Sequence, residues 1–277
     1  MSSQPSPGRR SRVWSDVDLD RPGKQAGYLQ IPWSVTRSAY GNISIPVVVI
    51  HGGDGPTALL MGGVHGDEYE AQIALSRIAR ELEPEHLQGR VIILPSTNLP
   101  AALAGTRVSP IDQVNLNRCF PGDPDGTPTP QIAFYIDAEL LPRTDVWLDL
   151  HSGGGSLAYV PFASIHAMPD AGQNARSLAA LHAFGAPVSV VWSFFDEPRM
   201  AKGCAERHGV TYLGSELGGG ASVNPAGVRL GYEGSLRVLR HAGILQADAP
   251  FDVPPAPPIR LMEAANRAFY AYAPEPR

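Results

Sequence analysis

Short apolar runs alternate along this chain with segments in which apolar residues recur at helical spacing. The runs typical of buried strands are IPVVVI, TALLMGG, RVIILPS, VWLDL, PVSVVW and VTYLGSEL, at residues 45–50, 57–63, 90–96, 146–150, 187–192 and 210–217. The helical patterns lie between and after them, at residues 68–84, 131–141, 177–185 and 232–245. Alternating strands and helices are typical of βαβ units. The pattern therefore predicts an α/β fold with a mixed, mainly parallel sheet flanked by helices.

The two ends of the chain depart from this alternation. Residues 1–25 are mostly polar, which predicts a flexible N-terminal tail. Five prolines fall within residues 249–260, and this composition is typical of a linker. A short helix is expected after it, over residues 261–272. We therefore expect one folded domain over residues 26–248, followed by a proline-rich linker and a short C-terminal helix.

Composition and charge exclude several classes of protein. The 277 residues are enough for one large α/β domain, and the net charge of −5 lacks the basic excess of a nucleic-acid-binding surface. No apolar run reaches the roughly 18 residues that a membrane span needs, and the N-terminus lacks the apolar segment of a secretory signal. The two cysteines, Cys119 and Cys204, form no CxxC pair, which favours a reducing compartment. We expect a cytoplasmic protein without a nucleic-acid or membrane partner.

The segment GGVHGDEYE follows the second apolar run and precedes a helical pattern. Ligands of parallel α/β sheets collect at the carboxyl ends of strands. His65 and Glu68 are three residues apart and would share one face if the helix begins here, whereas Asp67 would point elsewhere. An imidazole and a carboxylate suit zinc. The alternative is that Asp67 and Glu68 only place negative charge at a helix N-terminus, and the segment alone does not decide between the two.

A second histidine stands at another predicted strand end. His151 directly follows VWLDL and precedes a run of glycines. Asp149 lies two positions earlier and projects to the same side of the strand, where its carboxylate could orient His151 as a metal ligand. The alternative is a loop residue capped by Ser152. We interpret the other histidines as surface or structural residues: His51, His86, His166, His182, His208 and His241.

Two further segments carry groups that a hydrolytic zinc site would use. Glu216 ends the run VTYLGSEL beside three glycines, where it could carry a proton between water and a leaving amine. The loop at residues 105–122 holds Arg107, Asn117 and Arg118, and guanidinium groups bind carboxylates in bidentate fashion. The alternatives are a strand-edge glutamate paired with a surface cation, and a solvated surface loop.

The motifs GGVHGDE, NLNRCFPG, DLHSGG and SELGGG, in this order, resemble the succinylglutamate desuccinylase/aspartoacylase family of zinc-dependent deacylases. The similarity runs from roughly residue 27 to residue 245. Within the family, the phrases GDGPTALLMGGVHGDEYE, AGTRVSPID and LDLHSGG are most similar to the N-α-acetyl-L-2,4-diaminobutyrate deacetylases of ectoine breakdown.

The resemblance implies a zinc-carboxypeptidase-like fold in which residues 26–248 are the catalytic domain. It implies one Zn²⁺ per chain, held by His65, Glu68 and His151, with Glu216 as the general acid/base. The implied reaction removes an acyl group, acetyl in the most similar subgroup, from a small N-acyl amino acid.

The 105–122 loop is implied to contact the substrate. Arg107, Asn117 and Arg118 would bind its carboxylate and the developing oxyanion, so Arg107 would also act in catalysis. Family members carry a β-rich C-terminal part, which we expect to be largely missing here. A zinc carboxypeptidase-like peptidase and a non-catalytic small-molecule-binding relative stay as alternatives. The acyl group, the amine side chain and assembly into a homo-oligomer are left open.

Overall fold

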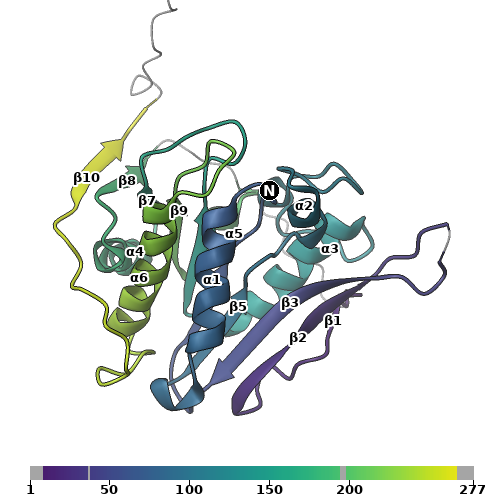
Figure 1. The fold of residues 1–277 in the computed structure, drawn as a ribbon, viewed down its shortest axis with the longest axis horizontal. Helices are drawn as coiled ribbons and strands as arrows, with labels where there is room; N and C mark the ends of the chain where they lie inside the picture. Colours follow the sequence, from purple (N-terminus) through teal and green to yellow (C-terminus); the bar gives the residue numbers. More distant parts are fainter. Residues whose placement is uncertain (1–8, 37, 194–197, 267–277) are drawn as a thin grey trace, which may run out of the picture.

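A single ten-stranded sheet forms the centre of the molecule (Figure 1). The computed structural model describes residues 9–36, 38–193 and 198–266. Its strands are β1 (Trp14–Ser15), β2 (Gly23–Pro32), β3 (Asn42–His51), β4 (Thr57–Met61), β5 (Arg90–Leu94), β6 (Val146–His151), β7 (Phe162–His166), β8 (Val188–Trp192), β9 (Thr211–Glu216) and β10 (Arg260–Ala264). They are ordered β1-β2-β3-β5-β4-β6-β9-β7-β8-β10.

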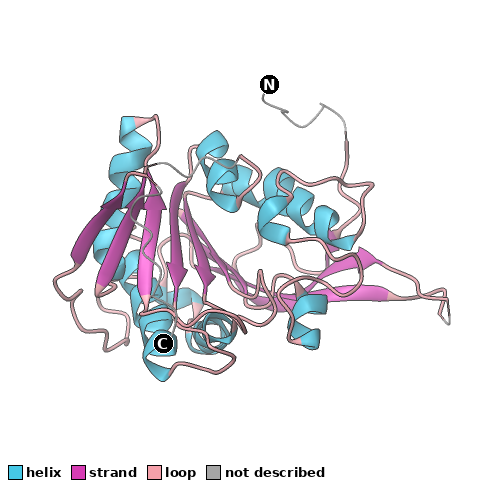
Figure 2. Cartoon of the chain, turned by 90° about the horizontal axis from the view of Figure 1, so that it is seen from above, coloured by secondary structure: helices cyan, strands magenta, loops and turns pink. Residues whose placement is uncertain are grey.

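Helices cover both faces of this sheet (Figure 2). The α-helices are α1 (Tyr69–Glu81), α2 (Leu99–Ala104), α3 (Pro128–Tyr135), α4 (Ala171–Phe184), α5 (Ala201–His208) and α6 (Pro225–His241). A π-helical turn, η3 (Ile136–Leu140), continues α3, and the 3₁₀ turns are η1 (Pro84–His86), η2 (Leu116–Arg118) and η4 (Leu141–Arg143). Helices α1, α4 and α6 pack on one face, and α3 and α5 pack on the other. Within the described ranges, no helix has both the length and the apolar character that crossing a bilayer requires.

The direction of the strands confirms the predicted fold class. Strands β5, β4, β6 and β9 run parallel to one another, as do β7, β8 and β10. The pairs β1–β2, β2–β3, β3–β5 and β7–β9 are antiparallel. The protein therefore has the expected α/β fold with a mixed, mainly parallel sheet flanked by helices. Because β4, β6 and β9 are parallel neighbours, their carboxyl ends meet at one edge of the sheet, where ligands of such sheets bind.

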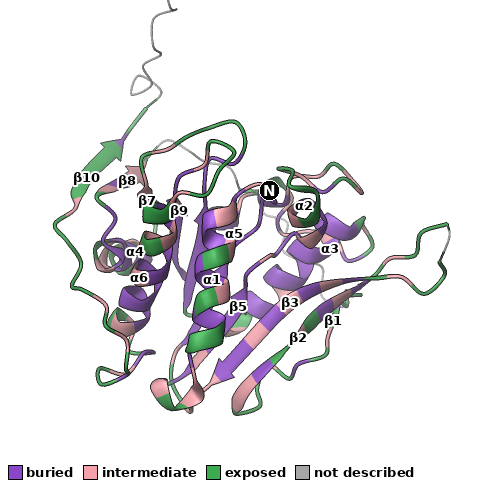
Figure 3. Ribbon diagram, in the orientation of Figure 1, coloured by how far each residue is buried: buried purple, intermediate pink, exposed green. Residues whose placement is uncertain are grey.

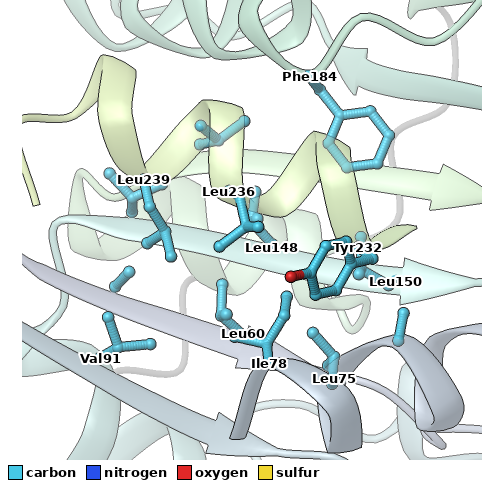
Figure 4. Packing of buried hydrophobic residues seen from close by; sticks show 14 of the residues in the cluster. Leu60, Leu75, Ile78, Val91, Leu148, Leu150, Phe184, Tyr232, Leu236 and Leu239 are labelled. Atoms are coloured by element: carbon cyan, nitrogen blue, oxygen red, sulfur yellow. The ribbon is translucent and has the colours of Figure 1, made fainter. Parts of the chain in front are cut away.

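Side chains alternate between two core layers along the central strands. Leu60 and Leu148 lie in the layer that contains Leu236 and Tyr232 of α6 (Figure 4). Trp147 packs in the other layer, beneath α3 and α5. Figure 3 shows both buried and exposed residues along α1 and α6, as expected of helices that pack on a sheet with one side. Every residue of β4 and β6 is buried, because helices cover both faces. Burial on both faces explains why these strands are continuous apolar runs in the sequence rather than alternating ones.

The N-terminal segment differs from the predicted flexible tail. Residues 9–25 pack against the rest of the chain: Val13 and Val17 are buried, and Trp14–Ser15 pairs with β2. Residues 1–8 lie outside the described residues. Two isolated valines anchor the segment, and such sparse apolar positions leave no periodic signal in a polar sequence.

The residues after 248 also differ from the predicted linker and helix. Phe251 and Val253 pack against the core, and Arg260–Ala264 forms β10 beside β8. Backbone pairing along β8 here outweighs the helical preference of the sequence LMEAA. The part of the predicted helix from residue 267 onward lies outside the described residues.

Leu236 allows a test of the packing between α6 and the sheet. It is wholly buried, whereas Leu103 in α2 is 80% exposed. We expect Leu236→Ala to lower the free energy of unfolding by about 2–5 kcal/mol, because it leaves a cavity in the core. Leu103→Ala is the matched control and should change it by about 0.5 kcal/mol or less. Urea denaturation measures both, and equal effects would contradict the packing described.

Candidate active site

Three neighbouring strands bring the predicted site residues to one edge of the sheet. β6 and β9 pair in a register that sets His151 beside Glu216. β4 pairs with the other side of β6 and leads, through residues 62–64, to His65. The strand ends that the sequence marks with glycines are therefore adjacent in space.

The segment between β4 and α1 is a turn rather than the start of a helix. α1 begins at Tyr69, and Glu68 is its N-cap residue, with extended backbone and no side-chain capping hydrogen bond. The expectation that His65 and Glu68 share a helix face is therefore wrong, because both precede the helix. Gly66 is required in this turn, since a Cβ there would overlap the backbone of Ala101.

The Glu68 carboxylate lies between two imidazoles. Its Oε1 is 2.6 Å from Nδ1 of His65, and its Oε2 is 2.8 Å from Nδ1 of His151. The backbone N–H of Ser152 also donates to Oε2, at 3.2 Å. Burial opposes ionisation of Glu68, but the two imidazoles outweigh it and lower its pKa to about 2. The buried group is therefore an anion with a nitrogen on each side.

The Nε2 atom of each imidazole contacts a side-chain oxygen on the side away from Glu68. Nε2 of His151 lies 3.1 Å from Oδ2 of Asp149, and Nε2 of His65 lies 3.1 Å from Oδ1 of Asn115. The Tyr212 hydroxyl donates to the same Asp149 oxygen at 3.0 Å. Burial acts to lower the pKa of His151, but the neighbouring carboxylates raise it well above its usual value. Both rings are thus oriented with Nδ1 toward the centre of the site.

This cluster has the composition of a metal site. His65, Glu68 and His151 each offer one donor atom, and these atoms lie within 4.8 Å of one another. Two imidazole nitrogens and one carboxylate oxygen form a donor set that zinc takes in hydrolytic sites. Hydrogen bonds such as those that Asp149 and Asn115 accept from the imidazoles are the kind that orient imidazole ligands. The residues present therefore fit the metal that the sequence predicts.

Glu216 lies beside the cluster and is held in an unusual state. Burial raises its pKa to about 8, although His151 acts in the opposite direction. Its Oε2 is buried and makes no hydrogen bond to the part of the chain that the structure describes. Glu216 and His151 line the same two cavities, of about 320 and 440 Å³. A carboxyl group that ionises near neutral pH can both accept and release a proton.

The 105–122 loop brings its three predicted residues to these cavities. Arg107, Asn117 and Arg118 line both of them. Nη1 of Arg107 is 3.3 Å from Oε1 of Glu68. Asn117 also has a structural role that was not expected, because its side-chain oxygen accepts the Ala201 N–H at 2.8 Å. Contact of these three residues with a substrate stays a prediction.

One wall of the 440 Å³ cavity is formed by residues that the sequence analysis did not predict as part of the site. Tyr159, Phe162, Trp192 and Met200 contribute apolar surface to it. His166, interpreted from sequence as a surface or structural residue, is buried at the end of β7 and lines this wall. Phe162, His166 and Trp192 come from β7 and β8, which carry no glycine-rich motif, and Tyr159 follows the glycines after His151. The alternation of β7 is a sequence signal that could have located Phe162 and His166.

Asp67 in the turn and Glu70 in the first turn of α1 bind the loops that follow the other two strands. Oδ2 of Asp67 accepts the N–H of Gly155 at 2.8 Å, in the loop that follows β6. Oε1 of Glu70 accepts the N–H groups of Gly219 and Asn224, at 3.1 and 3.0 Å, in the loop that follows β9. The sequence predicts at most a supporting or capping role for Asp67 and none for Glu70. A side chain that binds a distant backbone N–H leaves no local pattern.

Comparison with known proteins gives closely similar relatives. A profile described as the succinylglutamate desuccinylase/aspartoacylase catalytic domain matches residues 54–242. The chain is 44% identical over 261 residues to the N-alpha-acetyl-L-2,4-diaminobutyric acid deacetylase of Halomonas elongata. The aligned residues cover 94% of this chain and 76% of that protein.

Solved structures agree with the sequence matches. A succinylglutamate desuccinylase/aspartoacylase from Rhodobacter sphaeroides is 45% identical with a TM-score of 0.87, covering 95% of this chain and 79% of that one. The product-bound ectoine utilization protein EutE (DoeB) from Ruegeria pomeroyi is 41% identical with a TM-score of 0.87, covering 94% of this chain and 78% of that one.

Substitution of Glu70 tests its role as a tether. Glu70→Ala removes the acceptor of two backbone N–H groups, and an unsatisfied buried donor costs about 1–3 kcal/mol. We expect the free energy of unfolding to fall by about that amount, with faster hydrogen exchange at the Gly219 and Asn224 amides. Glu70→Gln keeps an acceptor oxygen and should retain most of the protection. If the Ala and Gln variants exchange equally at these amides, the tether does not hold the loop.

Proposed function

The chain belongs to the succinylglutamate desuccinylase/aspartoacylase family, and on that premise we propose that it is a zinc-dependent amidohydrolase acting on a small N-acyl amino acid. The proposed substrate is N-α-acetyl-L-2,4-diaminobutyrate, the compound named for the Halomonas elongata relative. Hydrolysis would yield acetate and the free amino acid. The observation that carries this proposal is the His65–Glu68–His151 donor set with the buried Glu216 beside it.

The proposed zinc ligands are His65, Glu68 and His151, with one Zn²⁺ per chain. Bound zinc supplies a Lewis acid that polarises a carbonyl group and lowers the pKa of water. Asp149 supports this role, because an N–H at Nε2 of His151 would donate to its carboxylate and leave Nδ1 as the donor toward the metal. The low pKa of Glu68 keeps the third ligand ionised.

Glu216 is the proposed proton carrier. Its position at the end of β9, next to His151, lets it take a proton from the water that attacks the acyl carbonyl. The carbon–oxygen bond forms first, the carbon–nitrogen bond then breaks, and Glu216 returns the proton to the leaving amine. Its raised pKa supports this role, because the same group must accept and release a proton near neutral pH.

The arginines are the proposed contacts for negative charge. The Nη1 group of Arg107 lies close to Glu68, where it can donate to the acyl carbonyl oxygen as negative charge develops on it. Arg118 and Asn117 line the adjoining cavity, where a guanidinium group can bind the substrate's α-carboxylate. The cavity volume of about 440 Å³ is within the range of small-molecule sites. The deacetylase activity named for the Halomonas elongata relative favours a deacylase over the alternative of a carboxypeptidase-like peptidase.

Metal removal and a substrate panel test the proposal together. Chelator-treated protein should lose hydrolysis of N-acetyl-diaminobutyrate and regain it when zinc is added. In a panel with N-succinylglutamate, N-acetylaspartate and short peptides, N-acetyl-diaminobutyrate should give the highest kcat/KM. Faster cleavage of a peptide, or no hydrolysis of any acyl amino acid by zinc-loaded protein, would show that the proposed function is wrong.

Glu216→Gln isolates the proton-transfer step. Glutamine keeps the size of the side chain but cannot carry the proton, so kcat should fall by about 10²–10⁴-fold. Bound zinc and KM should change little, because Glu216 is not among the proposed ligands. Steady-state kinetics with metal analysis of the same preparations checks this. A variant with normal zinc content and more than a tenth of the original kcat would exclude Glu216 as the proton carrier.

A further inference from the structure

A second cluster of metal-binding side chains lies outside the candidate active site. Sγ of Cys204 donates to Oδ1 of Asp137 at 2.7 Å, and Nε2 of His208 is 3.2 Å from the same oxygen. One donor atom from each of these three residues lies within 4.8 Å of the other two. We propose that Asp137, Cys204 and His208 form a second metal site, suited to zinc or a similar transition metal ion.

Local structure places the three donors together. Cys204 and His208 are four residues apart in α5 and therefore lie on one face of the helix. Asp137 lies in the π-helical turn η3, and π-helical turns are frequent at functional sites. Both elements pack on the same face of the sheet, so the turn directs a carboxylate at the helix face that carries the thiol and the imidazole.

The three residues differ in their access to solvent. Asp137 is 1% exposed and Cys204 is 0% exposed, whereas the His208 side chain is 24% exposed. His208 also lines a cavity of about 660 Å³. A metal ion can therefore reach the site from the imidazole side, and a water molecule can complete a tetrahedral coordination there.

The charge around the cluster is compatible with a divalent cation. The Arg207 guanidinium lies 3.7 Å from Oδ1 of Asp137 and opposes a cation, but it is also anchored to the backbone carbonyls of Pro198 and Gly203. Burial raises the pKa of the Cys204 thiol, so the metal must displace its proton. Binding exchanges the S–H bond for a sulfur–metal bond and releases the proton to solvent. The thiolate and the carboxylate then face the cation with two negative charges.

The donor types select the class of metal. One thiolate, one imidazole and one carboxylate suit zinc or cobalt, whereas magnesium and calcium prefer oxygen ligands alone. The charged side chain that faces this site from α5 is Arg207 and not a general base. We therefore expect the metal ion here to have a structural role. A metal here would join the C-terminal end of α5 to η3. The other end of α5 contacts the candidate active site, because the Ala201 N–H binds Asn117.

Cobalt(II) distinguishes this site from the first, which contains no thiol. Chelator-treated full-length protein titrated with Co²⁺ should bind two equivalents and show a near-ultraviolet thiolate-to-cobalt charge-transfer band. Cys204→Ser should abolish the band and reduce binding to one equivalent. Cys119→Ser, at the other cysteine, is the matched control and should change neither. His65→Ala should weaken the first site and leave the band in place.

His208→Gln provides a test that leaves the buried core unchanged. Loss of a ligand should lower cobalt affinity at the thiolate-containing site by more than the roughly 10–100-fold caused by losing an outer hydrogen bond. Circular dichroism confirms that each variant is folded. No charge-transfer band in folded wild-type protein at saturating Co²⁺, or an unchanged band in Cys204→Ser, would overturn the proposal. Neither result bears on hydrolysis at the first site, so the two proposals fail separately.

Discussion

The buried Glu68 carboxylate between two imidazoles is the interaction on which the arrangement of the site depends. An ionised group without solvent is strongly unfavourable unless partners surround it. The partners of Glu68 come from a turn after β4 and from the end of β6, so the carboxylate is stable only when these segments are correctly placed. Pairing of β4 with β6, and of β6 with β9, provides that placement and also positions Glu216.

The loops that leave these strands are held to one another as well as to the turn. The Gly153 N–H and the Tyr159 N–H both donate to the carbonyl of Gly218, so the loop after β6 is bonded to the loop after β9. Asp67 and Glu70 bind the same two loops from the β4 side. The two loops lie so close together that Gly219 is necessary, since a Cβ there would collide with the Leu157 carbonyl. Residues 65–70 thus contribute two candidate ligands, His65 and Glu68, and two side chains that bind the neighbouring loops, Asp67 and Glu70.

Much of the fold was predictable because the central strands are buried on both faces and are therefore mainly apolar runs. His65, Glu68, His151 and Glu216 were predicted to lie together, and the structure brings them together, because each follows or ends such a run. Elements that depend on partners distant in sequence were not predictable. β10 forms because β8 offers it backbone groups, and residues 9–25 pack through two isolated valines. The role of Glu70 was missed, and the partner of Asp67 was not identified, for the same reason, since their carboxylates accept N–H groups of remote loops.

The cavity wall and the candidate catalytic groups come from different parts of the chain. The candidate ligands and Glu216 lie on the turn after β4 and at the ends of β6 and β9, whereas Phe162, Trp192 and Met200 lie on β7, on β8 and just before α5. The two sets meet at Phe162, which pairs with Glu216 across β7 and β9. Substitution of the wall side chains would therefore change the shape of the cavity without replacing a candidate ligand or Glu216, provided that the backbone pairing at Phe162 is kept.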